Sequence, residues 1–283
     1  MRSVWVIARL TFHEARRSRI LLAAIVLSTL FLIVYALGIN FIYIEVTREA
    51  RVGGGPVFIE QREVLNFLTI AGLYVVNFLA VMMTVLTSVA TVSGEISSGT
   101  IHTLASKPVN RWNILFGKWV GYACMLSLYV LLLGGGVLGI VFLISRYSPP
   151  NIPVALSMIL LNTLMLLSLS LLGGSILSTL TNGVLLFGLF GIAFVGGWIE
   201  QIGSFLQNQT AVTVGIITSL MLPSEALWKR AAFSLQSPLV SALGGFTPFT
   251  STSVPSPLMV GYAVLFGLAA LLLAVLAFSR RDL

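Results

Sequence analysis

The stretch "VLNFLTIAGLYVVNFLAVMMTVLTSVATVSG", residues 64–94, decides the fold class. It contains no Asp, Glu, Lys, Arg or His, and a helix needs roughly 20 apolar residues to cross a bilayer. Four further windows also lack these residues, namely 20–44, 119–145, 147–199 and 231–279. The whole chain is 57% hydrophobic and 9% charged, whereas a soluble domain is about 25% charged. The sequence therefore predicts an integral membrane protein.

These windows predict an all-α membrane domain over residues 1–283 with six spans. The window 147–199 is long enough for two spans, and the turn signal Thr181-Asn182-Gly183 divides it. The expected spans are about 20–40, 65–93, 115–144, 153–180, 183–200 and 258–279. All should be helical, because a barrel would show short alternating strands. The first is too long for the core of a signal peptide, so we expect it to remain as an anchor.

The distribution of charge predicts the topology. If the N-terminus is inside, the inner segments carry ten Lys or Arg and three acids, while the outer segments carry six of each. This asymmetry is the positive-inside bias. We therefore expect a multi-pass protein of the cell inner or plasma membrane with both termini in the cytoplasm. The net charge of +7 then indicates membrane lipids, and no nucleic acid, as partners.

Three segments outside the spans have predicted structures. Residues 1–19 should form an amphipathic helix in the inner headgroup layer, although a basic flank that merely fixes the topology is the alternative. Residues 41–63 should form a short solvated loop. The outer segment 201–257 should contain a re-entrant or interfacial helix, Ala211–Leu222, and a short helix restarting after Pro223-Ser224.

A polar stripe along the second span has two interpretations. The five residues fall in one narrow sector of the helix: Asn66, Asn77, Thr84, Ser88 and Thr91. They could line a pathway or a dimer seam. Alternatively, they form hydrogen bonds between helices, which contribute under about 2 kcal/mol each.

Several chemistries lack their residues. The predicted spans hold no acid, His or Arg for binding a coupling ion, which disfavours a gradient-driven carrier. The only histidines are His13 and His102, and the only cysteine, Cys124, lies in a span, so no metal site is predicted. No G-x-x-x-x-G-K-[ST] phosphate loop occurs. We therefore expect a chain that is not an enzyme, binds no cofactor itself and takes energy from another chain.

The stretch "GEISSGTIHTLASKPVNRWNILFGKW", residues 94–119, is a polar and basic segment between two spans. Thr100 should cap a short helix that Pro108 ends, and Asn110 should cap the next helix. The result is a cytoplasmic element, residues 94–114, with an apolar face and a basic rim. It should insert into a groove on a cytoplasmic partner; the alternative is that it rests on anionic lipid.

This segment resembles a known family. The residues that carry the resemblance are Glu95, Gly99, Thr100, Leu104, Lys107, Pro108, Arg111, Gly117 and Lys118. They are similar to the signature E-x-x-x-G-T … P-x-x-R … G-K of type 2 (ABC-2) permeases of ATP-binding-cassette exporters. The opening "IARLTFHEARRSRILL" and the ending "FSRRDL" are similar to the copper-enzyme maturation permease group. The resemblance thus covers the whole chain.

The resemblance implies an N-terminal elbow helix, six transmembrane spans, a cytoplasmic coupling helix after the second span and re-entrant outer helices before the last. It also implies that two permease chains, as a homodimer or heterodimer, pair with separate ATPase subunits that bind ATP and Mg. Closure of those subunits would push the coupling segment and drive export. By resemblance, the transmission site is Glu95, Gly99, Thr100, Lys107, Pro108 and Arg111, with Ile101 and Leu104 as docking contacts.

Two other functions remain open at this stage. One is a facilitator or channel with an uncharged pathway, and the other is a membrane scaffold that recruits an ATPase without moving a substrate. Glu95 is either an ionic or capping latch at the cytoplasmic mouth or an ordinary boundary charge. The sequence assigns no substrate, and the export direction rests on the resemblance alone.

Overall fold

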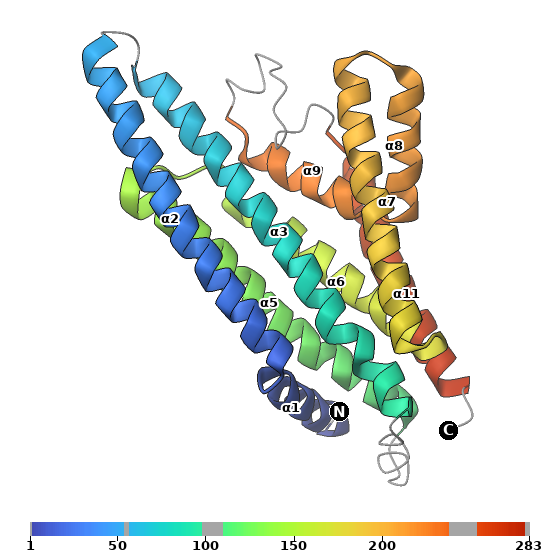
Figure 1. Cartoon of the computed structure of the whole chain (residues 1–283). Helices are drawn as coiled ribbons and strands as arrows, with labels where there is room; N and C mark the ends of the chain where they lie inside the picture. Colours follow the sequence, from blue (N-terminus) through green and yellow to red (C-terminus); the bar gives the residue numbers. More distant parts are fainter. Residues whose placement is uncertain (1, 54–56, 98–109, 238–253, 281–283) are drawn as a thin grey trace.

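The computed structural model describes residues 2–53, 57–97, 110–237 and 254–280. Within these ranges every regular element is an α-helix. The helices are α1 (Arg2–Arg16), α2 (Arg19–Gly53), α3 (Val57–Ser97), α5 (Arg111–Ser145), α6 (Ile152–Ile176), α7 (Thr179–Phe205), α8 (Gln209–Met221), α9 (Ser224–Leu235) and α11 (Pro257–Arg280). In Figure 1, α2, α3 and α5 run along one another, and α7 and α8 form a hairpin on the other side of the molecule.

The predicted all-α multi-span class is confirmed. Six described helices are long and apolar enough to cross a membrane: Arg19–Arg48, Gln61–Val89, Trp112–Ser145, Ile152–Ile176, Thr179–Phe205 and Pro257–Arg280. The short helices α8 and α9 follow one another with a bend of 108°. They lie where the sequence predicts a re-entrant or interfacial pair, and α9 crosses between the outer parts of α3 and α7 (Figure 1).

Helix α1 packs against the start of α5 through small residues. Ala8 and Ala15 are each 4% exposed. A Cβ added at Gly121 of α5 would lie 2.7 Å from the Ala8 carbonyl oxygen, so the two backbones touch there. Trp5 is 71% exposed. The apolar residues of α1 are therefore divided between a face packed on protein and a face open to a membrane interface.

The prediction of a loop at 41–63 is wrong. Helix α2 continues to Gly53 and α3 begins at Val57, so both helices extend beyond the apolar windows. The Thr47 hydroxyl donates to the Tyr43 carbonyl at 2.6 Å, and the Gln61 side-chain amide donates to Thr47 Oγ1 at 3.2 Å. Charged residues do not break a helix by themselves, since Glu and Arg are good helix formers.

The predicted turn at Thr181-Asn182-Gly183 is also wrong, because the chain turns four residues earlier. Helix α6 ends at Ile176, and Ser178 caps α7 by accepting a hydrogen bond from the Thr181 backbone at 3.4 Å. Asn182 lies inside α7, fully buried, and donates to the Ser170 carbonyl at 2.9 Å. Asn182 thus serves packing between α6 and α7, where it lies against Gly173, while Gly183 faces Val89 of α3.

Candidate functional site

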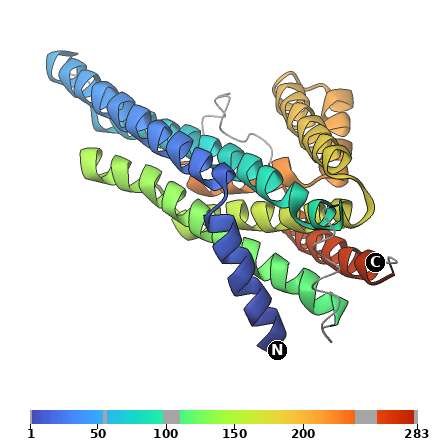
Figure 2. The ribbon, with the colours of Figure 1, turned by 60° about the horizontal axis from the view of Figure 1, so that its bottom comes forward.

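The predicted coupling segment follows α3 and precedes α5 in the chain. Of its proposed site residues, those from Gly99 to Pro108 lie outside the described residues: Gly99, Thr100, Ile101, Leu104, Lys107 and Pro108. Glu95 belongs to the last turn of α3 and Arg111 begins α5. Figures 1 and 2 place these helix ends at the same end of the molecule as α1 and the last turn of α11. The exposed Arg9, Arg16, Arg17 and Arg280 also lie on those two helices or just after α1.

The helices that flank this segment are joined by polar contacts. The Lys118 ammonium of α5, 5% exposed, donates to the Thr91 carbonyl of α3 at 3.4 Å. The Trp119 indole donates to the Ser168 hydroxyl of α6 at 3.0 Å. Asn110 occupies the N-cap of α5 without a side-chain cap hydrogen bond, so the predicted side-chain capping is wrong. The N-terminal part of α5, which follows the predicted coupling segment in the chain, is therefore held to α3 and α6.

The polar stripe of α3 is buried inside this chain. All five members are at most 7% exposed. The Asn162 amide of α6 donates to Asn77 at 3.0 Å, and the Ser88 hydroxyl donates to Ser170 of α6 at 2.7 Å. Thr84 and Thr91 donate to backbone carbonyls one turn earlier in α3. The bonds of Asn77 and Ser88 are the helix-to-helix bonds of the second interpretation, whereas those of Thr84 and Thr91 stay within α3. A role in a pathway or a dimer seam stays a prediction.

Asn66 is the member of the stripe nearest the N-terminus of α3. Its amide donates to the Tyr147 hydroxyl and to the Leu235 carbonyl, both at 2.7 Å. The second bond satisfies a carbonyl at the C-terminal end of α9, where helices lack internal donors. Burial raises the pKa of the Tyr147 phenol, which lies in the link between α5 and α6, and the hydrogen bond with Asn66 partly opposes that rise. Asn66 thereby ties α9 to α3.

A buried ion pair lies on the opposite side of α9. Glu200 of α7 and Lys229 of α9 are 2.8 Å apart, and their side chains are 10% and 4% exposed. Glu225, four residues before Lys229 on α9, is 5% exposed and interacts electrostatically with both. We call these three residues the outer charge cluster. It holds two carboxyl groups for one ammonium group.

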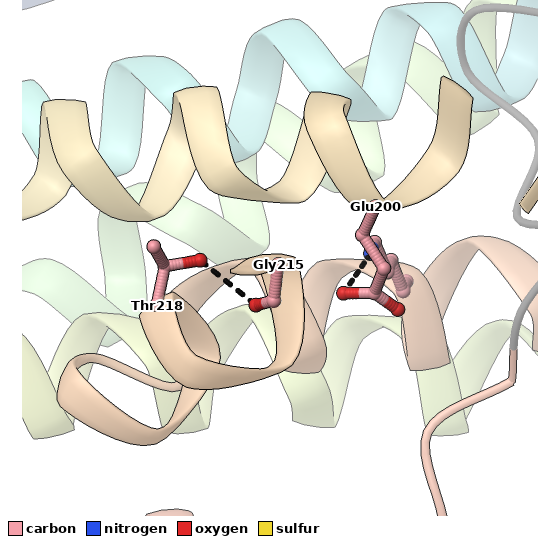
Figure 3. A network of polar contacts seen from close by, with 4 residues as sticks. Glu200, Gly215 and Thr218 are labelled. Carbon is pink, nitrogen blue, oxygen red and sulfur yellow. Dashed lines mark hydrogen bonds and ion pairs between the residues drawn. The ribbon is translucent and has the colours of Figure 1, made fainter. Parts of the chain in front are cut away.

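Glycines bring α7 and α8 together around this cluster. A Cβ added at Gly215 of α8 would overlap the Glu200 side chain, and one at Gly196 would overlap Thr218. Figure 3 shows Glu200 extending from α7 beside α8, close to Gly215, whose carbonyl accepts a hydrogen bond from Thr218 at 2.8 Å. Only glycine permits this spacing, which brings α8 against the Cα and Cβ of Glu200.

A pocket of about 340 Å³ opens beside the cluster. Glu200 and Lys229 line it together with Ser219 and Ser256. The apolar part of the wall comes from α8, α9, the start of α11 and the residues just before it: Val212, Ile216, Ala226, Val254, Pro255 and Met259. Arg230 of α9 donates to the Pro255 carbonyl at 3.0 Å and so holds the lining residues that precede α11. The pocket is thus largely apolar, with charge at one place.

Sequence reasoning missed this site. It counted Glu200, the last residue of the expected span 183–200, among the six acids of the outer segments, whereas Glu200 lies within the candidate span Thr179–Phe205. The statement that the spans hold no acid is therefore wrong. One local signal was available, since Glu225 and Lys229 stand four apart on a short helix and such residues share a face. Among the described residues, no group of three or more His, Cys, Asp or Glu could hold a metal ion.

The comparisons with known proteins agree with the signature at the coupling segment. Residues 5–283 match the family described as "ABC-2 family transporter protein". The chain belongs to the ABC-2 family of transporter proteins. A comparison with curated proteins finds no match. This ABC-2 chain is therefore a multi-pass membrane protein of a transporter family. The family match does not test the resemblance to the copper-enzyme maturation group.

Proposed function

We propose that this ABC-2 chain is the permease subunit of an ATP-binding-cassette exporter in the cell membrane. The observation that carries the proposal is the family match over residues 5–283, together with the resemblance of residues 94–119 to the permease signature. In this proposal an ABC ATPase subunit, which holds ATP and Mg, docks on the coupling segment. A second permease chain completes the transporter.

The arrangement of the helices supports a route for the coupling motion. Helix α3 extends from Val57 to Ser97. One helix therefore reaches from the predicted coupling segment to the contact with α9. Its inner end contacts α5 through Lys118 and its outer end contacts α9 through Asn66. A push on the inner end of α3 would therefore be felt at α9, because a helix transmits axial displacement along its hydrogen-bonded backbone.

The test is copurification from native membranes in mild detergent, followed by an ATPase assay. We expect an ABC ATPase to accompany the wild-type chain. The variant with Leu104→Asp and Arg111→Glu should lose the partner or its stimulated activity. Arg48→Glu, which reverses an exposed charge on α2, is the control and should retain both. Recovery of no ATPase with the wild-type chain would overturn the proposal.

One observation favours a second function, a gradient-driven carrier. Glu200 is a buried acid inside a candidate span, and such residues bind or relay ions in carriers. A carrier would move its substrate without an ATPase. The same copurification separates the two functions, because a carrier should be recovered without an ATPase. If the chain is a carrier, Arg111→Glu should also leave its transport activity unchanged.

A further inference from the structure

We propose that a groove between α2 and α3 binds an anionic phospholipid, with its phosphate at the arginines where α1 meets α2 and one acyl chain in the groove. The lipid belongs to the leaflet at the α1 end of the molecule. This inference goes beyond the proposed function and holds whether or not the chain recruits an ATPase. It is argued from the lining of the groove, its open rim and the charge at its end.

The groove is an apolar cavity of about 220 Å³. One wall consists of residues that lie one turn apart on a single face of α2, namely Ile20, Ala23, Ala24 and Leu27. Helix α3 supplies the opposite wall, which includes Met83 and Leu86. The distance along α2 from Ile20 to Leu27 is about 10 Å, and one leaflet offers about 15 Å of hydrocarbon. The groove therefore suits one acyl chain.

The floor and the rim of the groove favour an apolar occupant from the membrane. Tyr129 of α5 lines the floor, and its hydroxyl already shares a hydrogen bond of 2.7 Å with the Ser28 hydroxyl. Leu27 and Leu86, on the two walls, are 52% and 51% exposed. The groove is thus open along its side, and a chain that enters it meets apolar surface.

Basic side chains stand at the end of the groove where α1 leads into α2 (Figure 1). Arg16, Arg17 and Arg19 are exposed, and in the described part of the chain none of them forms an ion pair. Arg19 lies one turn before Ala23 on the same face of α2. An anionic group bound to Arg19 would therefore be in line with the groove.

The charge at this end indicates a phosphate without a balancing amine. Guanidinium groups bind phosphate oxygens through paired, charge-assisted hydrogen bonds. The Ser18 hydroxyl already accepts a hydrogen bond from the Leu21 amide at 3.1 Å in the first turn of α2, so the anchor falls to the arginine side chains. Glu14 is the only acid in the first 44 residues. A choline or amine head group would therefore face mainly positive charge.

The test measures lipid binding to the full chain in detergent by native mass spectrometry. The probes are dioleoyl phosphatidylglycerol and dioleoyl phosphatidylcholine, which share their acyl chains and differ in net charge. We expect phosphatidylglycerol to bind at least about fivefold more tightly, the factor expected for one basic side chain near an anionic head group. Arg19→Gln should lower that preference about fivefold. Arg280→Gln removes an exposed arginine at the same end of the molecule and should leave the preference unchanged.

Two matched leucine variants test the groove. Leu27→Trp places a larger side chain in the groove and should weaken the binding of both lipids. Leu22→Trp makes the same change on α2 at a residue that is 66% exposed and outside the lining, and it should weaken neither. Both leucines are exposed, so neither variant depends on refilling a core. If an arginine variant fails to give monodisperse protein, the lipid preference of the wild-type chain and the leucine pair decide.

Four results would overturn the proposal. Equal binding of the two lipids would leave a groove that takes any acyl chain. Equal effects of Arg19→Gln and Arg280→Gln would reduce the preference to a general attraction by the basic end. Equal effects of the two tryptophan variants would place the lipid elsewhere. The same spectra report the oligomeric state, and a dimer that Leu27→Trp separates would show that a second copy of the chain covers the groove.

Discussion

At the scale of single residues, the buried ion pair is the feature with the largest energetic consequence. Glu200 and Lys229 are mostly covered by protein, and their side chains are 10% and 4% exposed where they line the pocket. Removing one member of a buried pair leaves an uncompensated charge, which costs about 3–5 kcal/mol. Because two carboxyl groups share one ammonium group here, the two members of the pair are not equivalent.

We predict that Lys229→Met destabilises the protein more than Glu200→Gln. The first leaves two buried acids without a cation, whereas the second leaves Lys229 with Glu225. The expected loss for Lys229→Met is about 3 kcal/mol in the free energy of unfolding. Thermal unfolding in detergent, followed by tryptophan fluorescence, measures both. The double variant should be more stable than the sum of the single losses implies, and strictly additive losses would show that the pair is not coupled.

At the scale of helices, the α7–α8 hairpin depends on close backbone contact. A Cβ at Gly215 would overlap Glu200 and lie 2.7 Å from the Gly196 carbonyl oxygen. The same helix α7 also contains Gly191, around which nothing lies within 4 Å of an added Cβ. Replacing either glycine with alanine adds the same methyl group, at a crowded position for Gly215 and in open space for Gly191.

We therefore predict opposite effects of the same substitution on the two helices. Gly215→Ala should force α8 away from α7, lower the melting temperature and reduce the yield of monodisperse protein. Gly191→Ala should be neutral or stabilising by up to about 1 kcal/mol, because alanine favours a helix over glycine. Equal melting temperatures for the two variants would contradict the packing described for the hairpin.

The same scale shows what the sequence could and could not predict. The helical class and the spans follow from long windows without charge, since backbone groups in lipid must be satisfied internally. Local signals failed where a distant partner decides the outcome. Asn182 resembles a turn residue, but the Ser170 carbonyl of α6 gives its amide a partner inside a helix. Glu200 was assigned to an outer segment because the charge-free window 147–199 ends just before it. That window cannot show that helix α7 continues to Phe205, or that α8 and α9 cover Glu200.

At the scale of the whole molecule, charge and shape suggest one orientation in the membrane. The exposed arginines of α1 and Arg280 lie at one end of the molecule, and the turn between α7 and α8 lies at the other (Figure 1). Exposed positive charge is retained on the cytoplasmic side of a membrane. The amphipathic α1 and the inner ends of α3 and α5 would then face the cytoplasm, where an ATPase is available.

We predict that single cysteines will report this orientation. In a Cys124→Ser background, which has no other cysteine, Ser279→Cys and Thr210→Cys place one thiol at each end. Both replaced residues are exposed and uncharged, so neither change alters the charge asymmetry. A membrane-impermeant maleimide should label Thr210→Cys in intact cells and should label Ser279→Cys only after permeabilisation. The reverse pattern would place the coupling segment outside the cell and would remove the basis for ATP-driven coupling through it.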